Sequence, residues 1–296
     1  MDKNKKRNGN ETRNRNRMRL AVQALWTALT NGYAYGFVSG KIYTGRSKAF
    51  CVPGLNCYSC PGALGSCPIG ALQAVISGRG FSFSCYVFGI LMVFGSVFGR
   101  FICGWLCPFG MVQDLLYRIP MGKKIRALPG DRWLRYVKYM ILAVFVLLLP
   151  AAVTNVAGMG KPWFCQYICP SGTLLGGVPL LLVNEPLRAA AGWLFSWKMA
   201  LLLLILYGSV RMARPFCRYL CPLGAFYGFF NPVTFYRLRV DEEACISCGA
   251  CQKACPMDIR VWEKPDSAEC IRCGACRASC PTKAIQMGFS CRGKGM

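Results

Sequence analysis

The stretch that decides the fold lies near the C-terminus and reads Cys245-Ile-Ser-Cys248-Gly-Ala-Cys251-Gln-Lys-Ala-Cys255-Pro256, followed by Cys270-Ile-Arg-Cys273-Gly-Ala-Cys276-Arg-Ala-Ser-Cys280-Pro281. Each run has the spacing C-x2-C-x2-C-x3-C-P, which is typical of proteins that hold [4Fe–4S] clusters with cysteine thiolates. The glycine in each run permits the tight turn that three ligands from one loop require. The two runs predict a small α+β ferredoxin domain of the bacterial two-cluster type.

The fourth cysteine of each run is expected to serve the cluster of the other run. The predicted ligands are Cys245, Cys248, Cys251 and Cys280 for the first cluster, and Cys270, Cys273, Cys276 and Cys255 for the second. A pair of zinc sites is the alternative, which two complete runs in tandem disfavour. Thiols at this density also indicate a reducing compartment.

The rest of the chain has the composition of a membrane protein. Of its 296 residues 54% are hydrophobic, and the mean hydropathy is +0.33. Since roughly 20 apolar residues cross a bilayer as a helix, we expect a mainly α fold with about four transmembrane helices, over 20–40, 81–99, 134–153 and 191–210. The predicted domains are a basic disordered tail (1–19), a transmembrane helical domain (20–237) and the ferredoxin domain (238–296).

Charge predicts the orientation. The net charge of +24 is concentrated in the tail, in 118–135 and just after residue 210, and basic loops stay cytoplasmic. We therefore expect a multi-pass protein of a bacterial plasma (inner) membrane, with both termini cytoplasmic and with 41–80 and 155–190 on the outer side. The tail is expected to bind membrane lipid; an RNA-binding arm is the less favoured alternative, so no nucleic-acid partner is predicted.

The chain contains no histidine. This excludes histidine-ligated haem and Rieske centres, and it removes the commonest general base. We therefore predict no haem and no catalytic residue, and expect an electron-transfer component of an oxidoreductase system rather than a stand-alone enzyme.

An eleven-residue pattern occurs twice, at 100–110 and 214–224, and each copy contains Cys-x3-Cys-Pro. Cysteines four apart share one face of a helix. We expect Cys103, Cys107, Cys217 and Cys221 to form a third metal site, most simply an iron–sulfur cluster. The alternative is that they are small apolar side chains packed between helices. Arg100 and Arg214 flank this site, either to offset cluster charge or as positive-inside anchors.

Six more cysteines lie in the stretches expected on the outer side: Cys51, Cys57, Cys60, Cys67, Cys165 and Cys169. One cluster needs four ligands, so a fourth cluster with two spare thiols is one interpretation. Disulfides in an oxidising environment are the other. Cys85 and Cys291 stand alone and are expected to take no part.

These motifs together resemble the membrane polyferredoxin family, which includes the quinol-dehydrogenase membrane component of periplasmic nitrate reduction and the membrane half of the nitrous-oxide-reduction regulator. The resemblance runs from about residue 20 to 285 and is carried by the paired Cys-x3-Cys-Pro motifs and the C-terminal ferredoxin. It implies electron transfer between a quinol pool or flavoprotein and a partner redox protein.

The expected role is a relay with two [4Fe–4S] clusters and one or two further iron–sulfur clusters. Its expected partners are a cytoplasmic ferredoxin or flavoprotein on one side and a quinone or extracytoplasmic flavoprotein on the other. The alternative is a redox-sensing or maturation accessory of a metalloenzyme system. A transporter subunit is disfavoured, because the spans carry few acidic groups and the chain has no G-x4-G-K-[ST] loop.

Overall fold

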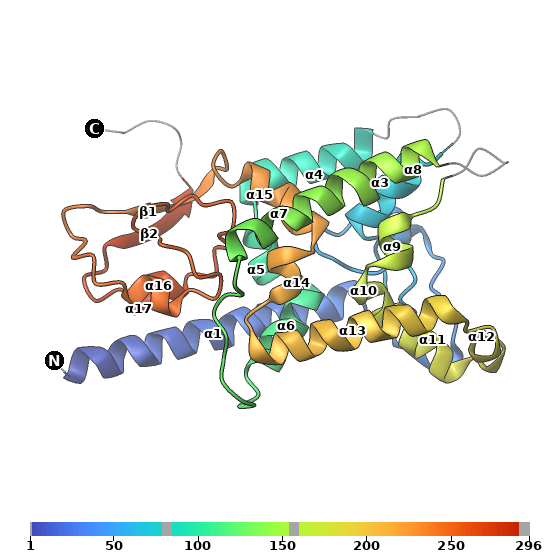
Figure 1. Cartoon of the computed structure of the whole chain (residues 1–296), viewed down its shortest axis with the longest axis horizontal. Helices are drawn as coiled ribbons and strands as arrows, with labels where there is room; N and C mark the ends of the chain where they lie inside the picture. Colours follow the sequence, from blue (N-terminus) through green and yellow to red (C-terminus); the bar gives the residue numbers. More distant parts are fainter. Residues whose placement is uncertain (1, 79–84, 154–159, 290–296) are drawn as a thin grey trace.

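The computed structural model describes residues 2–78, 85–153 and 160–289. It is mainly helical, with a helical body and a small unit built on one sheet, at the left in Figure 1. The body contains α1 (Asp2–Thr30), α2 (Ala34–Ser39), the 3₁₀ turn η1 (Arg46–Ala49), α3 (Pro68–Ile76), α4 (Cys85–Phe98), α5 (Phe101–Trp105), α6 (Pro108–Tyr117), α7 (Asp131–Ile141), the π-helical η2 (Leu142–Leu148), α8 (Leu149–Ala152), α9 (Trp163–Tyr167), α10 (Pro170–Gly172), the π-helical η3 (Thr173–Gly177), α11 (Val178–Val183), α12 (Glu185–Ala189), α13 (Trp193–Arg211), α14 (Pro215–Tyr219) and α15 (Pro222–Phe230).

The small unit is the ferredoxin domain. Its strands β1 (Tyr236–Val240) and β2 (Ile285–Phe289) pair antiparallel, with Tyr236 opposite Phe289. Between them lie the two cysteine runs, each with a short helix, α16 (Ala250–Ala254) or α17 (Ala275–Ser279). The unit is thus α+β, and β1 begins two residues before the predicted boundary at 238.

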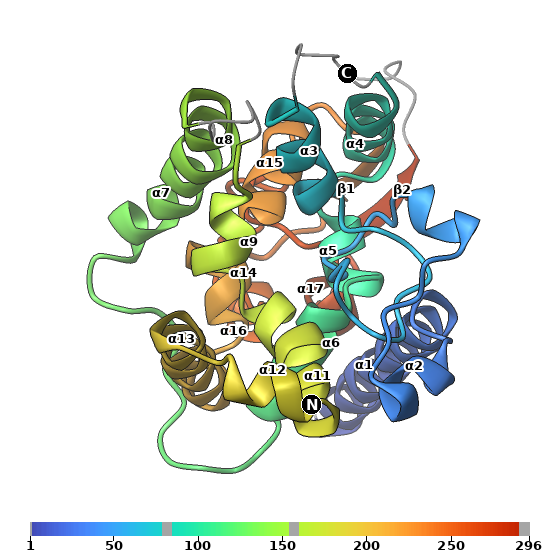
Figure 2. The same ribbon diagram turned by 90° about the vertical axis from the view of Figure 1, so that its right-hand side faces the viewer.

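The long helices of the body surround the short ones. Figure 2 shows α1, α4, α7 and α13 around the outside, with α5, α9 and α14 between them. Four helices of the body begin at a Cys-Pro pair, namely α3, α6, α10 and α15. Proline at the first helical position has no N–H to lose and a φ already suited to the helix. The Cys-Pro pairs therefore fix where these helices start and place a thiol at each start.

Two of the four predicted spans correspond to helices that can cross a membrane. Over the described residues, 131–152 and 193–211 are long and apolar enough. Helix α4 has 14 residues, and residues 81–84 of the predicted span lie outside the described part. Residues 170–183 form another apolar helical segment of similar length. The count of four spans and the orientation of the termini stay predictions.

The continuous helix predicted over 20–40 is wrong. Helix α1 ends at Thr30, α2 begins at Ala34, and the backbone N–H of Tyr33 between them donates to the carbonyl of Gly62 (3.2 Å). The chain turns here because these backbone groups bond to a neighbouring loop instead of continuing the helix.

The tail over 1–19 also differs from its prediction of disorder, because α1 is helical from Asp2. The reason is that two of its basic side chains, Arg15 and Arg19, have protein partners. Arg15 donates to the carbonyl of Gly274 at 3.0 Å, and Arg19 forms an ion pair with Asp114 at 2.9 Å. Helix α1 therefore runs along the body and packs on α17 of the ferredoxin domain (Figure 1).

A buried carboxylate joins the ferredoxin domain to the body. Glu269 pairs with Arg100 at 2.9 Å and with Lys138, and both cationic side chains are completely buried. Burial alone would raise the pKa of Glu269, but the charges of Arg100 and Lys138 lower it below its usual value. The carboxylate is therefore ionised and shared by two cations.

We expect Glu269→Gln to destabilise the docked ferredoxin domain, because it leaves Arg100 and Lys138 buried without their counter-charge. Breaking a buried ion pair typically costs about 3–5 kcal/mol. The measurement is the midpoint of thermal unfolding of the purified protein in detergent. The matched control is Glu263→Gln, whose partner Arg260 is exposed. Equal midpoints for the two variants would contradict the role given to Glu269.

Candidate iron–sulfur sites

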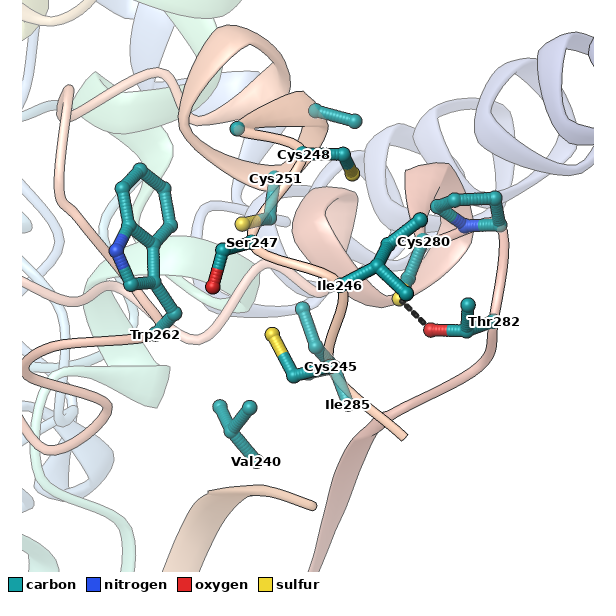
Figure 3. Close-up of a pocket in the computed structure, with 13 residues that line it drawn as sticks. Val240, Cys245, Ile246, Ser247, Cys248, Cys251, Trp262, Cys280, Thr282 and Ile285 are labelled. Atoms are coloured by element: carbon teal, nitrogen blue, oxygen red, sulfur yellow. Dashed lines mark hydrogen bonds between the residues drawn. The ribbon is translucent and has the colours of Figure 1, made fainter. Parts of the chain in front are cut away.

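The first predicted ligand set lines one pocket of the ferredoxin domain. Cys245, Cys248, Cys251 and Cys280 surround it, together with Trp262, Ile246 and Val240. Figure 3 shows three of these thiols coming from one loop and Cys280 from the segment after α17. This is the crossed arrangement that the sequence predicts.

The second predicted set lines another pocket. Cys255, Cys270, Cys273 and Cys276 surround it, and the remaining lining is largely apolar, including Leu238, Met257 and Ile271. Burial raises the pKa of Cys270 to about 11 and that of Cys255 to about 12. Cys270 and Cys255 are therefore protonated at neutral pH without a metal, and metal binding would release their protons.

Each loop turns through residues with positive φ. Gly249 and Gly274 have φ of 69° and 75°, as the sequence argument requires, since glycine adopts this conformation without strain. Ser247 and Arg272 each precede the second cysteine of their run, and their φ angles are 51° and 50°. Equivalent positions in the two runs thus take the strained conformation, as expected where a loop must direct three thiols inward.

The third predicted set also comes together, and we call Cys103, Cys107, Cys217 and Cys221 the near quartet. All four side chains are buried. Cys103 and Cys217 lie on α5 and α14, while Cys107 and Cys221 precede α6 and α15. The pKa of Cys221 is raised well above its usual value, first by burial and then by the charges of Cys217, Cys103 and Cys107. The four thiols are therefore close neighbours.

Two arginines connect the two repeat copies that form the near quartet. Arg100 is the first residue of one copy of the repeat and donates to the carbonyl of Cys217 at 3.0 Å. Arg214 is the first residue of the other copy and donates to the carbonyl of Cys103. Each guanidinium thus reaches across to the other copy. Arg214 is held in turn by Asp114 through two hydrogen bonds. Because both arginines are completely buried, they act as structural cations of the site and not as lipid anchors.

Three hydrogen bonds reach sulfur in the near quartet. The side-chain amide of Gln113 donates to Cys217 Sγ at 3.1 Å and accepts from the backbone N–H of Phe216 at 3.2 Å. The N–H of Gly110 donates to Cys107 Sγ and that of Gly224 to Cys221 Sγ, both at 3.4 Å. These donors, two of them at helix N-termini, favour thiolates.

Four of the six remaining predicted cysteines also converge, and we call Cys57, Cys67, Cys165 and Cys169 the far quartet. The pKa of Cys169 is raised to about 12, first by burial and then by the charges of Cys57 and Cys67. Cys57 and Cys169 are also the strongest charged neighbours of Cys165.

Cys51 and Cys60 are not among the thiols whose charges act most strongly on Cys67, Cys165 and Cys169, although Cys60 lies next to Cys57 and donates its N–H to the Cys57 carbonyl at 3.1 Å. Cys51 sits in a bridge to Ser66, and Cys60 has only Cys57 among its principal thiol neighbours. Cys85 is exposed on α4, Cys291 lies outside the described residues, and the described cysteines form no disulfide.

None of these cysteine sets forms a single-ion site in the part of the chain that the structure describes. Among the described residues, no three Cys, Asp or Glu side chains converge on one point as ligands of a single ion. A cubane cluster takes one thiolate at each of four iron corners, so its ligands stand apart. The donor set, four buried thiols with nearby cations and N–H donors, fits such a cluster at the near quartet.

Sequence reasoning missed Gln113, Asp114 and Glu269. A signal for Gln113 exists, because Cys-Pro-x-Gly-x-x-Gln occurs at 107–113 and again at 67–73. No local signal marks Asp114 or Glu269, whose partners are distant along the chain.

Comparison with protein families covers most of the chain from residue 83 to residue 286. One model, described as a 4Fe-4S binding domain, matches 83–127, 142–183 and 190–238, and a second with the same description matches 238–261 and 263–286. The chain belongs to the membrane polyferredoxin family. As a polyferredoxin it is a ferredoxin-type iron–sulfur electron-transport protein with 4Fe-4S binding domains.

Several relatives of this polyferredoxin are known by sequence. It is 32% identical to an uncharacterized protein of Methanocaldococcus jannaschii over 60% of this chain and 67% of the relative. It is 31% identical to the methylamine utilization ferredoxin-type protein MauN of Methylobacillus flagellatus (64% and 60%), and 28% identical to the ferredoxin-type protein NapH of Haemophilus influenzae (56% and 51%). The alignments thus span about half to two thirds of these relatives. No solved structure matches the chain.

If the near quartet holds an iron–sulfur cluster, we expect Gln113→Leu to lower its reduction potential, because a hydrogen bond to a ligand sulfur stabilises the reduced form. The measurement is a redox titration followed by electron paramagnetic resonance (EPR). The matched control is Gln23→Leu, since Gln23 is equally buried but donates to the carbonyl of Gly104 and not to sulfur. A potential unchanged in Gln113→Leu, or shifted equally in the control, would contradict the assignment.

Proposed function

We propose that this polyferredoxin relays single electrons between a cytoplasmic redox partner and a quinone or an extracytoplasmic flavoprotein. In this proposal the two ferredoxin ligand sets and the near quartet each hold a [4Fe–4S] cluster. Such clusters, when bound, supply one-electron transfer without proton chemistry. The chain would act as a component of a larger oxidoreductase system.

The observation that carries the proposal is the direct contact between the second ferredoxin site and the near quartet. A side chain at Gly104, next to Cys103, would meet the carbonyl oxygen of Ile271 at 2.3 Å. Trp105 donates to the carbonyl of Arg272 at 3.2 Å. The loop that carries Cys270 and Cys273 therefore packs on α5, which carries Cys103, and glycine at 104 permits the close approach.

The interface is fixed from several sides, which keeps the two sites at a constant separation. Asn231 donates to the carbonyl of Cys270 at 2.8 Å, and Arg272 donates back to the carbonyl of Asn231 at 2.8 Å. Both side chains are almost fully buried. Water is excluded from this contact, and a dry, rigid setting is what a relay between neighbouring sites needs.

The outer surface of the body supports a place in the membrane. Helix α13 exposes Leu203 and Leu204 near its middle. Trp193 and Trp197 are exposed near its N-terminus, and Tyr207 is exposed toward its C-terminus. Aromatic residues at both ends of an apolar helix are typical of membrane interfaces. In the proposal α7–α8 and α13 cross the plasma membrane, the ferredoxin domain lies in the cytoplasm, and the basic α1 lies near anionic lipid.

The proposal is tested in liposomes that contain the purified protein and a menaquinone analogue. A low-potential donor added outside should reduce the quinone in wild type. In Cys103→Ser/Cys107→Ser the rate should fall to that of protein-free liposomes, because the site between the ferredoxin domain and the bilayer is lost. Quinone reduction is followed by its ultraviolet absorbance.

The control variant is Cys85→Ser, which changes an exposed cysteine on α4. It should transfer electrons at the wild-type rate. Undiminished transfer in Cys103→Ser/Cys107→Ser would refute the relay and favour a redox-sensing or maturation accessory instead.

A further inference from the structure

We infer that Cys57, Cys67, Cys165 and Cys169 are the ligands of a further iron–sulfur cluster, built on the same plan as the near quartet. The inference rests on the proposed function, because it extends the same row of sites away from the ferredoxin domain. It also selects four ligands among six cysteines, leaving Cys51 and Cys60 free.

Gly70 and Gly172 each lie beside two of the four cysteines. A side chain at Gly70 would meet Cys165 Sγ at 3.8 Å and Cys67 Cβ at 3.9 Å. A side chain at Gly172 would meet Cys57 Sγ at 3.6 Å and Cys169 Sγ at 3.9 Å. Each glycine is the fourth residue of a Cys-Pro-x-Gly segment, so its missing side chain leaves room beside the thiols.

The far quartet repeats the hydrogen bonding of the near quartet. Gln73 donates to Cys165 Sγ at 3.3 Å and accepts from the N–H of Phe164 at 3.0 Å. Gln113 makes the same two bonds to Cys217 and to Phe216. If the thiols were only apolar side chains packed together, nothing would require a buried glutamine at each quartet that donates to a cysteine sulfur and accepts from a backbone N–H.

The residues that make these hydrogen bonds lie in segments whose sequences are also repeated. Residues 164–170 read Phe-Cys-Gln-Tyr-Ile-Cys-Pro, and 216–222 read Phe-Cys-Arg-Tyr-Leu-Cys-Pro. With Cys-Pro-x-Gly-x-x-Gln at 67–73 and 107–113, three of the four ligands match between the quartets. The fourth differs, because Cys103 lies four residues before its Cys-Pro and Cys57 lies ten before.

At the far quartet two lysines, Lys48 and Lys198, supply the positive charge that Arg100 and Arg214 supply at the near quartet. Lys198 donates to the carbonyl of Cys165 at 3.2 Å and is among the charges that act on Cys57 and Cys169. Lys48 is 5% exposed, its Nζ has no hydrogen-bond partner, and its main charged neighbours are Cys60 and Cys57. A buried ammonium is costly without a counter-charge, and an anionic thiolate cluster would supply one.

Further unpaired polar groups border the same four cysteines. Asn56 precedes Cys57 and Ser171 lies between Cys169 and Gly172; both side chains are completely buried, and their polar atoms have no partner among the described residues. Buried polar groups are almost always hydrogen-bonded. A cluster whose sulfides and thiolates accept hydrogen bonds would satisfy such donors.

Tyr227 links the two quartets. It is completely buried and donates to the carbonyl of Pro53 at 3.0 Å. Its strongest charged neighbours include Cys103 and Cys107 of the near quartet and Cys67 of the far quartet. Both quartets therefore lie near this one aromatic side chain, which places the far quartet next to the near quartet.

The test counts iron and acid-labile sulfide per chain in full-length protein purified without oxygen. We expect about sixteen irons in wild type and about four fewer in Cys67→Ser/Cys169→Ser. The matched control, Cys51→Ser/Cys60→Ser, should keep the wild-type content. Retained EPR signals of the ferredoxin clusters show that each variant is folded.

Unchanged iron in Cys67→Ser/Cys169→Ser would overturn the inference, and an equal loss in the control would overturn the choice of ligands. Cys103→Ser/Cys107→Ser separates this result from the proposed function. If that variant alone loses about four irons, the relay stands without the far cluster. If only the far-quartet variant loses iron, the far cluster stands and the proposed route through the near quartet fails.

A second variant keeps all four ligands. Gln73→Leu should leave the iron content unchanged and lower the potential of one cluster, which must differ from the cluster affected by Gln113→Leu. An unchanged set of potentials in Gln73→Leu would overturn the inference even where the cysteine variants fail to accumulate.

Discussion

The structure depends on a single electrostatic constraint: thiols buried in an apolar helical body become metal ligands only where fixed positive charge and N–H donors offset their negative charge. At the near quartet Arg100 and Arg214 meet this constraint, and each reaches across to the backbone of the other repeat. Their counter-ions then fix neighbouring parts of the molecule. Glu269 fixes the ferredoxin domain through Arg100, and Asp114 draws α1 onto α6 through Arg19. The charges that suit the site for a cluster thus also hold the domains together.

Helix initiation explains how the thiols of each quartet are brought together. Each Cys-Pro pair starts a helix and leaves its thiol at the positive end of that helix. The tertiary structure brings the N-termini of α6 and α15 to the near quartet and those of α3 and α10 to the far quartet. The glycines of these segments keep the thiols accessible to a cluster, and Gly104 lets the ferredoxin loop approach α5 closely.

Much of this arrangement could be predicted from sequence, because the decisive signals are short and local. The tandem cysteine runs predicted which four thiols line each pocket of the ferredoxin domain, and the repeated Cys-x3-Cys-Pro predicted which thiols meet at the near quartet. The helix pattern was less informative: apolar content predicted 134–153 and 191–210 well, but it could not show that α1 ends at Thr30. The basic tail was mistaken for a free segment because Gly274 and Asp114, which bind its arginines, lie far away in sequence. Spacing also could not distinguish Cys57 from Cys51 and Cys60, since that choice depends on how the loop 51–67 folds over α10.

The central claim is that the chain carries clusters beyond its ferredoxin domain, in the helical body. The most direct measurement is an anomalous difference map at the iron absorption edge, from crystals of the full chain grown without oxygen. The account predicts iron peaks between the paired repeats, enclosed by Cys103, Cys107, Cys217 and Cys221, in addition to the two in the ferredoxin domain. Iron confined to the ferredoxin domain, with the thiols of α5 and α14 packed against one another, would contradict it.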